Sequence, residues 1–133
     1  MDVVIIDDSE ALRQRVITLI SELPFINIAG EAENSLVGLD VIRKVKPALA
    51  IIDIKIPGVN GIEVMKKVKE EFPSIKVIML TNYPYPQYKN VALEGGADYF
   101  LNKSDEFEKL PEIIKTINNG FSWKIRNNQT IIN

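Results

Sequence analysis

Five short apolar runs, each followed by a segment with helical spacing of apolar residues, constrain the fold of this chain more than any other feature. The runs are rich in valine and isoleucine, as in VVII and ALAII, which is typical of strands covered on both faces. The predicted strands span residues 3–6, 26–32, 48–52, 75–80 and 97–101. The alternation predicts an α/β fold with a doubly wound five-stranded parallel sheet, (βα)5, and right-handed crossovers.

Proline and glycine mark the ends of the helices between these strands. Ser35 is the expected N-terminal cap of the second helix, and Pro86 and Pro111 are expected in the first turns of the fourth and fifth helices. The helices are expected to stop at or before Pro24, Pro47, Pro73, Gly95 and Gly120.

The length and charge of the chain limit its functional class. With 133 residues, 46% of them apolar, it fits one domain with a substantial core. The net charge of −2 offers no basic surface for nucleic acid. No apolar run approaches the roughly 20 residues that span a bilayer, and the start lacks the pattern of a secretory signal. We therefore expect a cytoplasmic protein without a membrane or nucleic-acid partner of its own.

The chain contains no cysteine and no histidine. This excludes disulfides, thiolate metal sites and cysteine nucleophiles, and it removes the usual general base and transition-metal ligand. Carboxylates, lysines and hydroxyls remain as the reactive groups. They favour a hard cation, Mg²⁺ rather than Zn²⁺.

Charged residues follow three of the predicted strands. Asp7 and Asp8 follow the first strand, Asp53 the third and Lys103 the fifth. Ligands of open parallel sheets bind beyond the carboxyl ends of the strands, so we expect these side chains to share one edge. The sequence predicts a divalent-cation and phosphoryl site there.

The chain resembles the receiver domain of two-component response regulators, the CheY-like superfamily, over about residues 1–120. The matching segments are VIIDDSE, IIDIKIPGVNG, MLT and DYFLNK, each at the expected strand end, while MLTNY and the Lys103 and Ser104 pair are similar to LuxR/NarL-type receivers. The resemblance implies a flavodoxin-like strand order, 2-1-3-4-5. Residues 121–133 are left as a C-terminal tail of unknown structure.

The resemblance implies that Asp53 is the phosphoacceptor, a carboxylate nucleophile that forms an aspartyl phosphate. Lys103 would place its ammonium against one phosphoryl oxygen, and Thr81 would donate its hydroxyl to another. The chain would catalyse only its own phosphorylation and dephosphorylation, so it is not expected to be an enzyme.

The resemblance also implies a Mg²⁺ site. Asp8 would bind the ion directly, Asp7 would assist through a water, and Asp53 and the main-chain carbonyl of Lys55 would complete the protein ligands. Three crowded carboxylates repel one another, and a cation relieves that repulsion.

A switch and two kinds of partner follow from the same resemblance. Thr81 and Phe100 are the expected switch pair, with Phe100 outward or mobile before phosphorylation and packed inward afterwards. The fourth helix, fifth strand and fifth helix would form the face read by a downstream protein, and a homodimer is an alternative. Because the chain has no histidine, its phosphate must come from a sensor histidine kinase or a phosphotransfer protein.

The chain departs from the family in three places. Ser104 replaces a proline common in receivers, which predicts a trans bond after Lys103 and a differently shaped loop. Lys55 and Tyr83 occupy positions that, in the family, tune water access to the phosphoryl group, and their size suggests slow hydrolysis.

Other functions stay open. The chain could be a phosphorylation-independent pseudo-receiver that only binds proteins, or a Mg²⁺-dependent phosphohydrolase of haloacid-dehalogenase type. The second aspartate expected by that family would stand at position 55, which is Lys55. The receiver is either a stand-alone protein or part of a regulator whose DNA-binding half lies outside this sequence. Nucleic acid is an expected partner only in the second case.

Overall fold

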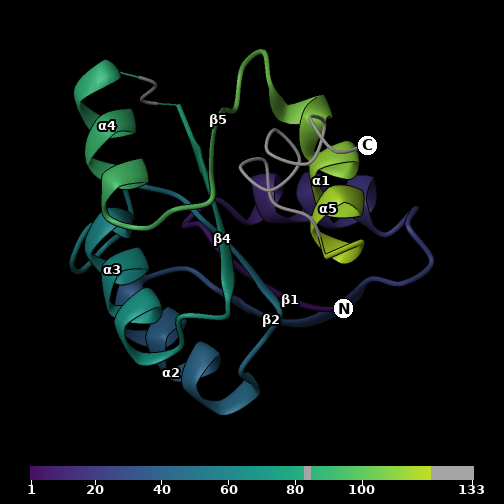
Figure 1. The fold of residues 1–133 in the computed structure, drawn as a ribbon, viewed down its shortest axis with the longest axis horizontal. Coiled ribbons are helices and arrows are strands. Elements are labelled where there is room, and N and C mark those ends of the chain that lie inside the picture. The colour runs from purple at the N-terminus through teal and green to yellow at the C-terminus, as the bar shows by residue number, and fades with distance from the viewer. Residues whose placement is uncertain (83–84, 121–133) are drawn as a thin grey trace, which may run out of the picture.

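The computed structural model describes residues 1–82 and 85–120, which form a parallel sheet with helices on both faces (Figure 1). The strand order is β2-β1-β3-β4-β5, and all four strand pairings are parallel. The predicted fold class and strand order are confirmed. The elements are β1 (Asp2–Ile6), α1 (Glu10–Ile20), β2 (Asn27–Ala32), α2 (Ser35–Val45), β3 (Leu49–Ile52), α3 (Gly61–Glu71), β4 (Lys76–Thr81), α4 (Pro86–Glu94), β5 (Tyr99–Asn102), the short 3₁₀ helix η1 (Phe107–Lys109) and α5 (Leu110–Asn118).

The two faces of the sheet carry separate apolar clusters. Side chains alternate across each strand, so Val4 and Ile6 of β1 pack on the side of α2, α3 and α4, while Val3 and Ile5 pack on the side of α1 and α5. Full burial of such a side chain contributes roughly 1.5–3 kcal/mol. The continuous apolar runs of the sequence follow from this two-sided burial.

The structure corrects several predicted boundaries. Asn34, not Ser35, caps α2, because its side chain accepts a hydrogen bond from the Val37 amide. β5 begins at Tyr99 rather than at 97, because the Ala97 amide bonds to the Ala92 carbonyl and so closes the end of α4. The end of a helix or strand depends on which group each backbone amide hydrogen-bonds to. That group can lie outside the short stretch of sequence used for the prediction.

The remaining predictions about the chain concern one peptide bond, membrane-spanning helices and the C-terminal tail. The described residues contain no cis peptide bond, which confirms the trans bond between Lys103 and Ser104. Within 1–82 and 85–120, none of the helices has both the length and the apolar character needed to cross a membrane. The predicted C-terminal tail, 121–133, lies outside the described residues.

Candidate functional site

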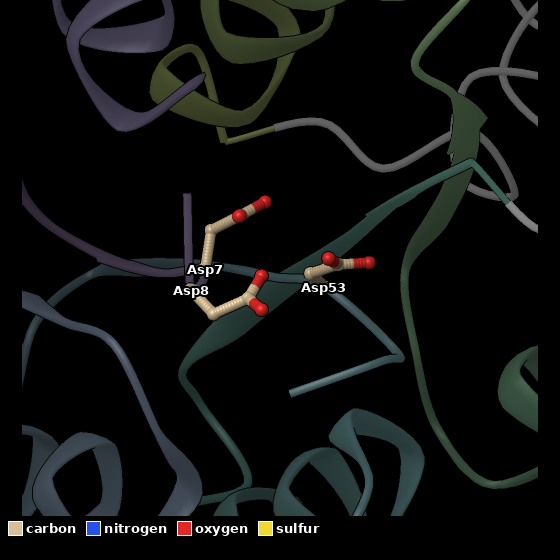
Figure 2. Close-up of side chains that lie close together, drawn as sticks. All are labelled: Asp7, Asp8 and Asp53. Atoms are coloured by element: carbon tan, nitrogen blue, oxygen red, sulfur yellow. The ribbon is translucent and has the colours of Figure 1, made fainter. Parts of the chain in front are cut away.

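The carboxyl ends of β1 and β3 bring three aspartates together. Asp7 and Asp8 follow β1 and Asp53 follows β3, and these strands are direct neighbours in the sheet. One carboxylate oxygen from each residue lies within 4.8 Å of those of the other two. Figure 2 shows the three side chains gathered at this edge of the sheet. Asp7 and Asp53 are buried, whereas Asp8 is exposed. The cluster therefore has a buried floor and a side open to solvent.

Lys103 reaches this cluster from the end of β5. Its Nζ donates to Asp7 Oδ2 at 2.6 Å and to Asp53 Oδ2 at 3.0 Å. All three side chains are less than a tenth exposed. The Lys103 amide also bonds to the Thr81 carbonyl at 2.9 Å, so the end of β4 helps to hold the lysine backbone. The structure thus brings Asp7, Asp8, Asp53 and Lys103 together as the sequence predicts.

The environment of Asp53 is electrostatically unfavourable for its charged form. Its Oδ1 atom is buried and has no hydrogen-bond partner among the described residues. Burial raises the pKa of the Asp53 carboxyl and the nearby Asp7 charge adds to this rise, while Lys103 opposes it. One ammonium does not balance three carboxylates. An additional cation would fit this site.

The donor set indicates the class of cation that the site would hold. The three carboxylates are hard oxygen ligands, and the buried, unpaired Asp53 Oδ1 is an oxygen that still requires a partner. Oxygen ligands suit Mg²⁺ or Ca²⁺ rather than thiolate-preferring metals. The residues present therefore fit a hard divalent cation, and magnesium is one such ion.

The loop between β1 and α1 is held by residues near Asp7. The Ser9 amide donates to Asp7 Oδ1 at 2.8 Å, and the Ser9 hydroxyl caps α1 by accepting from the Leu12 amide at 3.2 Å. Arg13 Nη1 donates to the Asp7 carbonyl at 2.6 Å, and its Nε pairs with Glu31 of β2 at 3.0 Å. The sequence analysis missed Arg13. Its position one turn into the helix after two aspartates is the signal that could have found it.

The loop between β3 and α3 is tightly shaped near the acceptor. The Gly61 amide bonds to the Ile54 carbonyl at 2.7 Å, and a Cβ at Gly61 would lie 1.8 Å from the Asp53 carbonyl oxygen. Only glycine allows this close approach. Lys55 lies in the same loop, with its Nζ 5.9 Å from the centre of the Tyr88 ring of α4. Tyr83, paired with Lys55 in the hydrolysis prediction, lies outside the described residues.

The two predicted switch residues are both buried. Thr81 ends β4, and Phe100 of β5 lies in the apolar cluster on the side of α2, α3 and α4. Phe100 pairs with Met79 in the register of the two strands. Phe100 is therefore inward in this structure, the position that the sequence analysis assigned to the phosphorylated form.

The loop after Lys103 uses hydrogen bonds where many receivers have a proline. Asn102 Oδ1 accepts from the Ser104 amide at 2.9 Å, and Glu106 Oε1 accepts from the Asn102 amide at 3.0 Å. The Glu106 amide returns a bond to the Asn102 carbonyl at 2.9 Å. This reciprocal pairing anchors the residue before Lys103. Glu106 was also missed, because a glutamate in a polar segment does not reveal a distant partner.

Known proteins share both the sequence pattern and the fold. The family model described as the response regulator receiver domain matches residues 3–115. The transcriptional regulatory protein YhcZ of Bacillus subtilis is 34% identical over 83% of this chain and 51% of its own length. The nitrate/nitrite response regulator NarL of Escherichia coli K12 is 34% identical over 81% of this chain and 50% of its own length.

A solved structure gives the same result. The isolated REC domain of RcsB from Salmonella enterica serovar Typhimurium, determined with the phosphomimetic BeF3−, superposes with a TM-score of 0.86 at 25% identity. The match covers 92% of this chain and 91% of that domain. The chain spans about half the length of the curated relatives that it matches. On the family match, the similarity to response regulators and the shared strand order, this chain belongs to the response regulator receiver domains of two-component systems.

Proposed function

We propose that the chain is phosphorylated on Asp53 in a Mg²⁺-dependent reaction and that the phosphoryl group switches a protein-interaction face. The observation that carries this proposal is the placement of Asp53 beside Lys103, with one carboxylate oxygen bonded to the ammonium and the other buried without a partner among residues 1–82 and 85–120. An aspartate that served only as a structural ion-pair partner would have both oxygens satisfied.

The transfer begins at the Asp53 carboxylate. One of its oxygens attacks the phosphorus of a phosphohistidine on the donor, forming an O–P bond as the N–P bond breaks and its electron pair returns to the imidazole. Lys103 contacts the phosphoryl oxygens as charge moves onto the acceptor, because its ammonium already lies 3.0 Å from Asp53 Oδ2. The donor supplies the phosphoryl group and keeps the electron pair of the broken bond, so the transfer consumes no further reactant.

The same acidic cluster would hold the metal. Asp8 would bind the ion directly, Asp7 through a water, and Asp53 and the Lys55 carbonyl would complete the protein ligands. When bound, Mg²⁺ would neutralise the phosphoryl oxygens. The fit rests on the three clustered carboxylates and the unpaired Asp53 oxygen.

The switch would act through Thr81 and Phe100. A charge-assisted hydrogen bond from the Thr81 hydroxyl to the phosphoryl group is worth about 1.5–3 kcal/mol. That free energy shifts a two-state equilibrium by roughly 10- to 150-fold. Phosphorylation would favour the inward position of Phe100 over an outward one, and this population shift would change the face formed by α4, β5 and α5.

The partners follow from this chemistry. The donor would be a cytoplasmic sensor histidine kinase or phosphotransfer protein, and the reader would be a downstream protein or a second copy of the chain. We propose residues 1–120 as the receiver domain and 121–133 as a tail. DNA would be reached only through an output domain outside this sequence, as the transcriptional role in the names of the relatives suggests.

The test is labelling with a small phosphodonor. The protein is incubated with Mg²⁺ and acetyl phosphate, and the phosphoryl group is located by mass spectrometry. Uptake of beryllofluoride in the presence of Mg²⁺ is followed separately by intrinsic fluorescence. One phosphoryl group on Asp53, lost in Asp53→Asn and kept in Asp40→Asn, supports the proposal. Asp40 is an exposed aspartate of α2 and serves as the matched control.

The alternatives predict different results. A pseudo-receiver would take up no phosphoryl group or beryllofluoride at any Mg²⁺ concentration. A phosphohydrolase would instead release phosphate from unrelated phosphoesters with many turnovers. Either outcome would overturn the proposed function.

A further inference from the structure

Ser35, the first residue of α2, is bonded to the loop that carries the proposed phosphoacceptor. Its hydroxyl donates to the Pro57 carbonyl at 3.2 Å and accepts from the Val59 amide at 2.9 Å. The Ser35 amide donates to the same Pro57 carbonyl at 3.0 Å. The side chain is almost fully buried although it is polar and begins a helix. These three bonds, here called the Ser35 clasp, join the start of α2 to the β3–α3 loop.

Gly58 is shaped to accommodate the clasp. It lies between the two residues that Ser35 binds, and its φ is +94°, a conformation that favours glycine. A Cβ at Gly58 would lie 2.0 Å from the Ser35 oxygen. The serine hydroxyl therefore occupies the space that any larger residue at position 58 would need.

The other end of the loop is held independently. Asn60 caps α3 by accepting from the amides of Ile62 and Glu63, and the Gly61 amide binds the Ile54 carbonyl. With Asp53 at the end of β3, the clasp and the cap restrain residues 54–60 from two sides. Lys55 lies inside this restrained segment, two residues after Asp53.

We propose that Ser35 is a positioning residue for magnesium: the clasp holds the β3–α3 loop in the conformation that presents the Lys55 main-chain carbonyl to the ion. The inference rests on the proposed function. A loop carbonyl binds a small cation well only if its direction is set beforehand, because Mg²⁺ tolerates little deviation from octahedral geometry. Partners that orient a metal ligand typically change metal affinity by 10- to 100-fold.

The first test compares Ser35→Ala with Thr116→Ala. Thr116 of α5 bonds to the Glu112 carbonyl of its own helix, so its substitution removes a hydroxyl that has no connection to the loop. Isothermal titration calorimetry with Mg²⁺ alone measures the dissociation constant of each protein. We expect Ser35→Ala to raise it about 10-fold and Thr116→Ala to leave it unchanged.

Two further measurements separate positioning from simple stabilisation. The Mg²⁺ concentration for half-maximal acetyl phosphate labelling should rise in Ser35→Ala, while the labelling rate at saturating Mg²⁺ stays near that of the wild type. Gly58→Ala should also weaken Mg²⁺ binding, because its added methyl group would displace the Ser35 hydroxyl from the loop. Combined with Ser35→Ala it should weaken binding by less than the two single effects together, because both disturb the clasp and only the strain at φ +94° is specific to position 58.

The outcomes are distinct. A Ser35→Ala protein that melts at a lower temperature in EDTA but binds Mg²⁺ like the wild type would show a purely structural serine and overturn the inference. That result would leave the proposed function intact. Absence of Mg²⁺ binding by the wild type would overturn both.

Discussion

Lys103 donates a hydrogen bond to Asp53 across the strand that separates them. Lys103 follows β5 and Asp53 follows β3, and β4 lies between these strands in the sheet. The ammonium spans this strand to reach Oδ2 at 3.0 Å and Asp7 at 2.6 Å. Among the described residues, Lys103 is thus a cation that partly neutralises both buried carboxylates before any metal binds.

Lys103→Met should destabilise the protein strongly in the absence of Mg²⁺. The change keeps most of the side-chain length but leaves two buried carboxylates without their cation, a loss of about 3–5 kcal/mol for a buried pair. Mg²⁺ should restore part of it. Urea unfolding in EDTA and in Mg²⁺ measures both effects. Lys115→Ala removes an exposed ion pair and should change stability by less than about 1 kcal/mol; equal losses in both variants would contradict the argument.

Asp53→Asn should raise the melting temperature in EDTA at neutral pH while abolishing phosphorylation. The pKa of Asp53 is raised in the folded protein, mainly by burial, so the folded state binds a proton more readily than the unfolded chain. Ionisation therefore costs stability, and that cost grows as the pH rises from the ordinary value of 3.8 through the raised pKa. The advantage of the variant should shrink in acid. Thermal melts of both proteins across this pH range test the prediction. A melting-temperature difference that does not change with pH would exclude the electrostatic cause.

Gly61→Ala should damage both stability and the site. Its methyl group would lie 1.8 Å from the Asp53 carbonyl oxygen, a backbone contact that no side-chain rotation can relieve. Overpacking of this kind costs about 1–3 kcal/mol or more, and the displaced Asp53 should label slowly. In Gly120→Ala no atom of the described residues lies within 4 Å of the added Cβ, so the expected penalty comes from the backbone conformation, φ +79°. Labelling by acetyl phosphate should be normal in that control.

Glu106→Ala should loosen the end of β5 by removing the acceptor of the Asn102 amide, at about 1 kcal/mol. The pKa of Glu106 is lowered, first by its hydrogen bond with Lys109, so its contribution exists above the ordinary value of 4.5 and is lost as the pH falls through the lowered pKa. Wild type and variant should therefore converge in stability below that range. Chemical denaturation at pH 7 and in acid measures the difference, and a gap that widens in acid would refute this role.

The sequence alone was sufficient for much of the architecture. Apolar runs such as 48–52 report burial on both faces of a strand, and burial is a property that neighbouring residues share, so the elements and their order were predictable. The same reasoning located Asp7, Asp53 and Lys103 at strand ends. Once parallel strands are assumed, their carboxyl ends must meet at one edge.

Only the tertiary structure decided how those side chains are partnered. The contacts of Lys103 join residues 50 and 96 positions apart, and the Ser35 clasp joins residues 24 positions apart. No local pattern encodes such pairs, because each bond depends on the packing of whole elements against one another. For this reason Ser35 resembled a helix cap in the sequence, whereas in the folded protein its hydroxyl binds a different loop and Asn34 caps the helix.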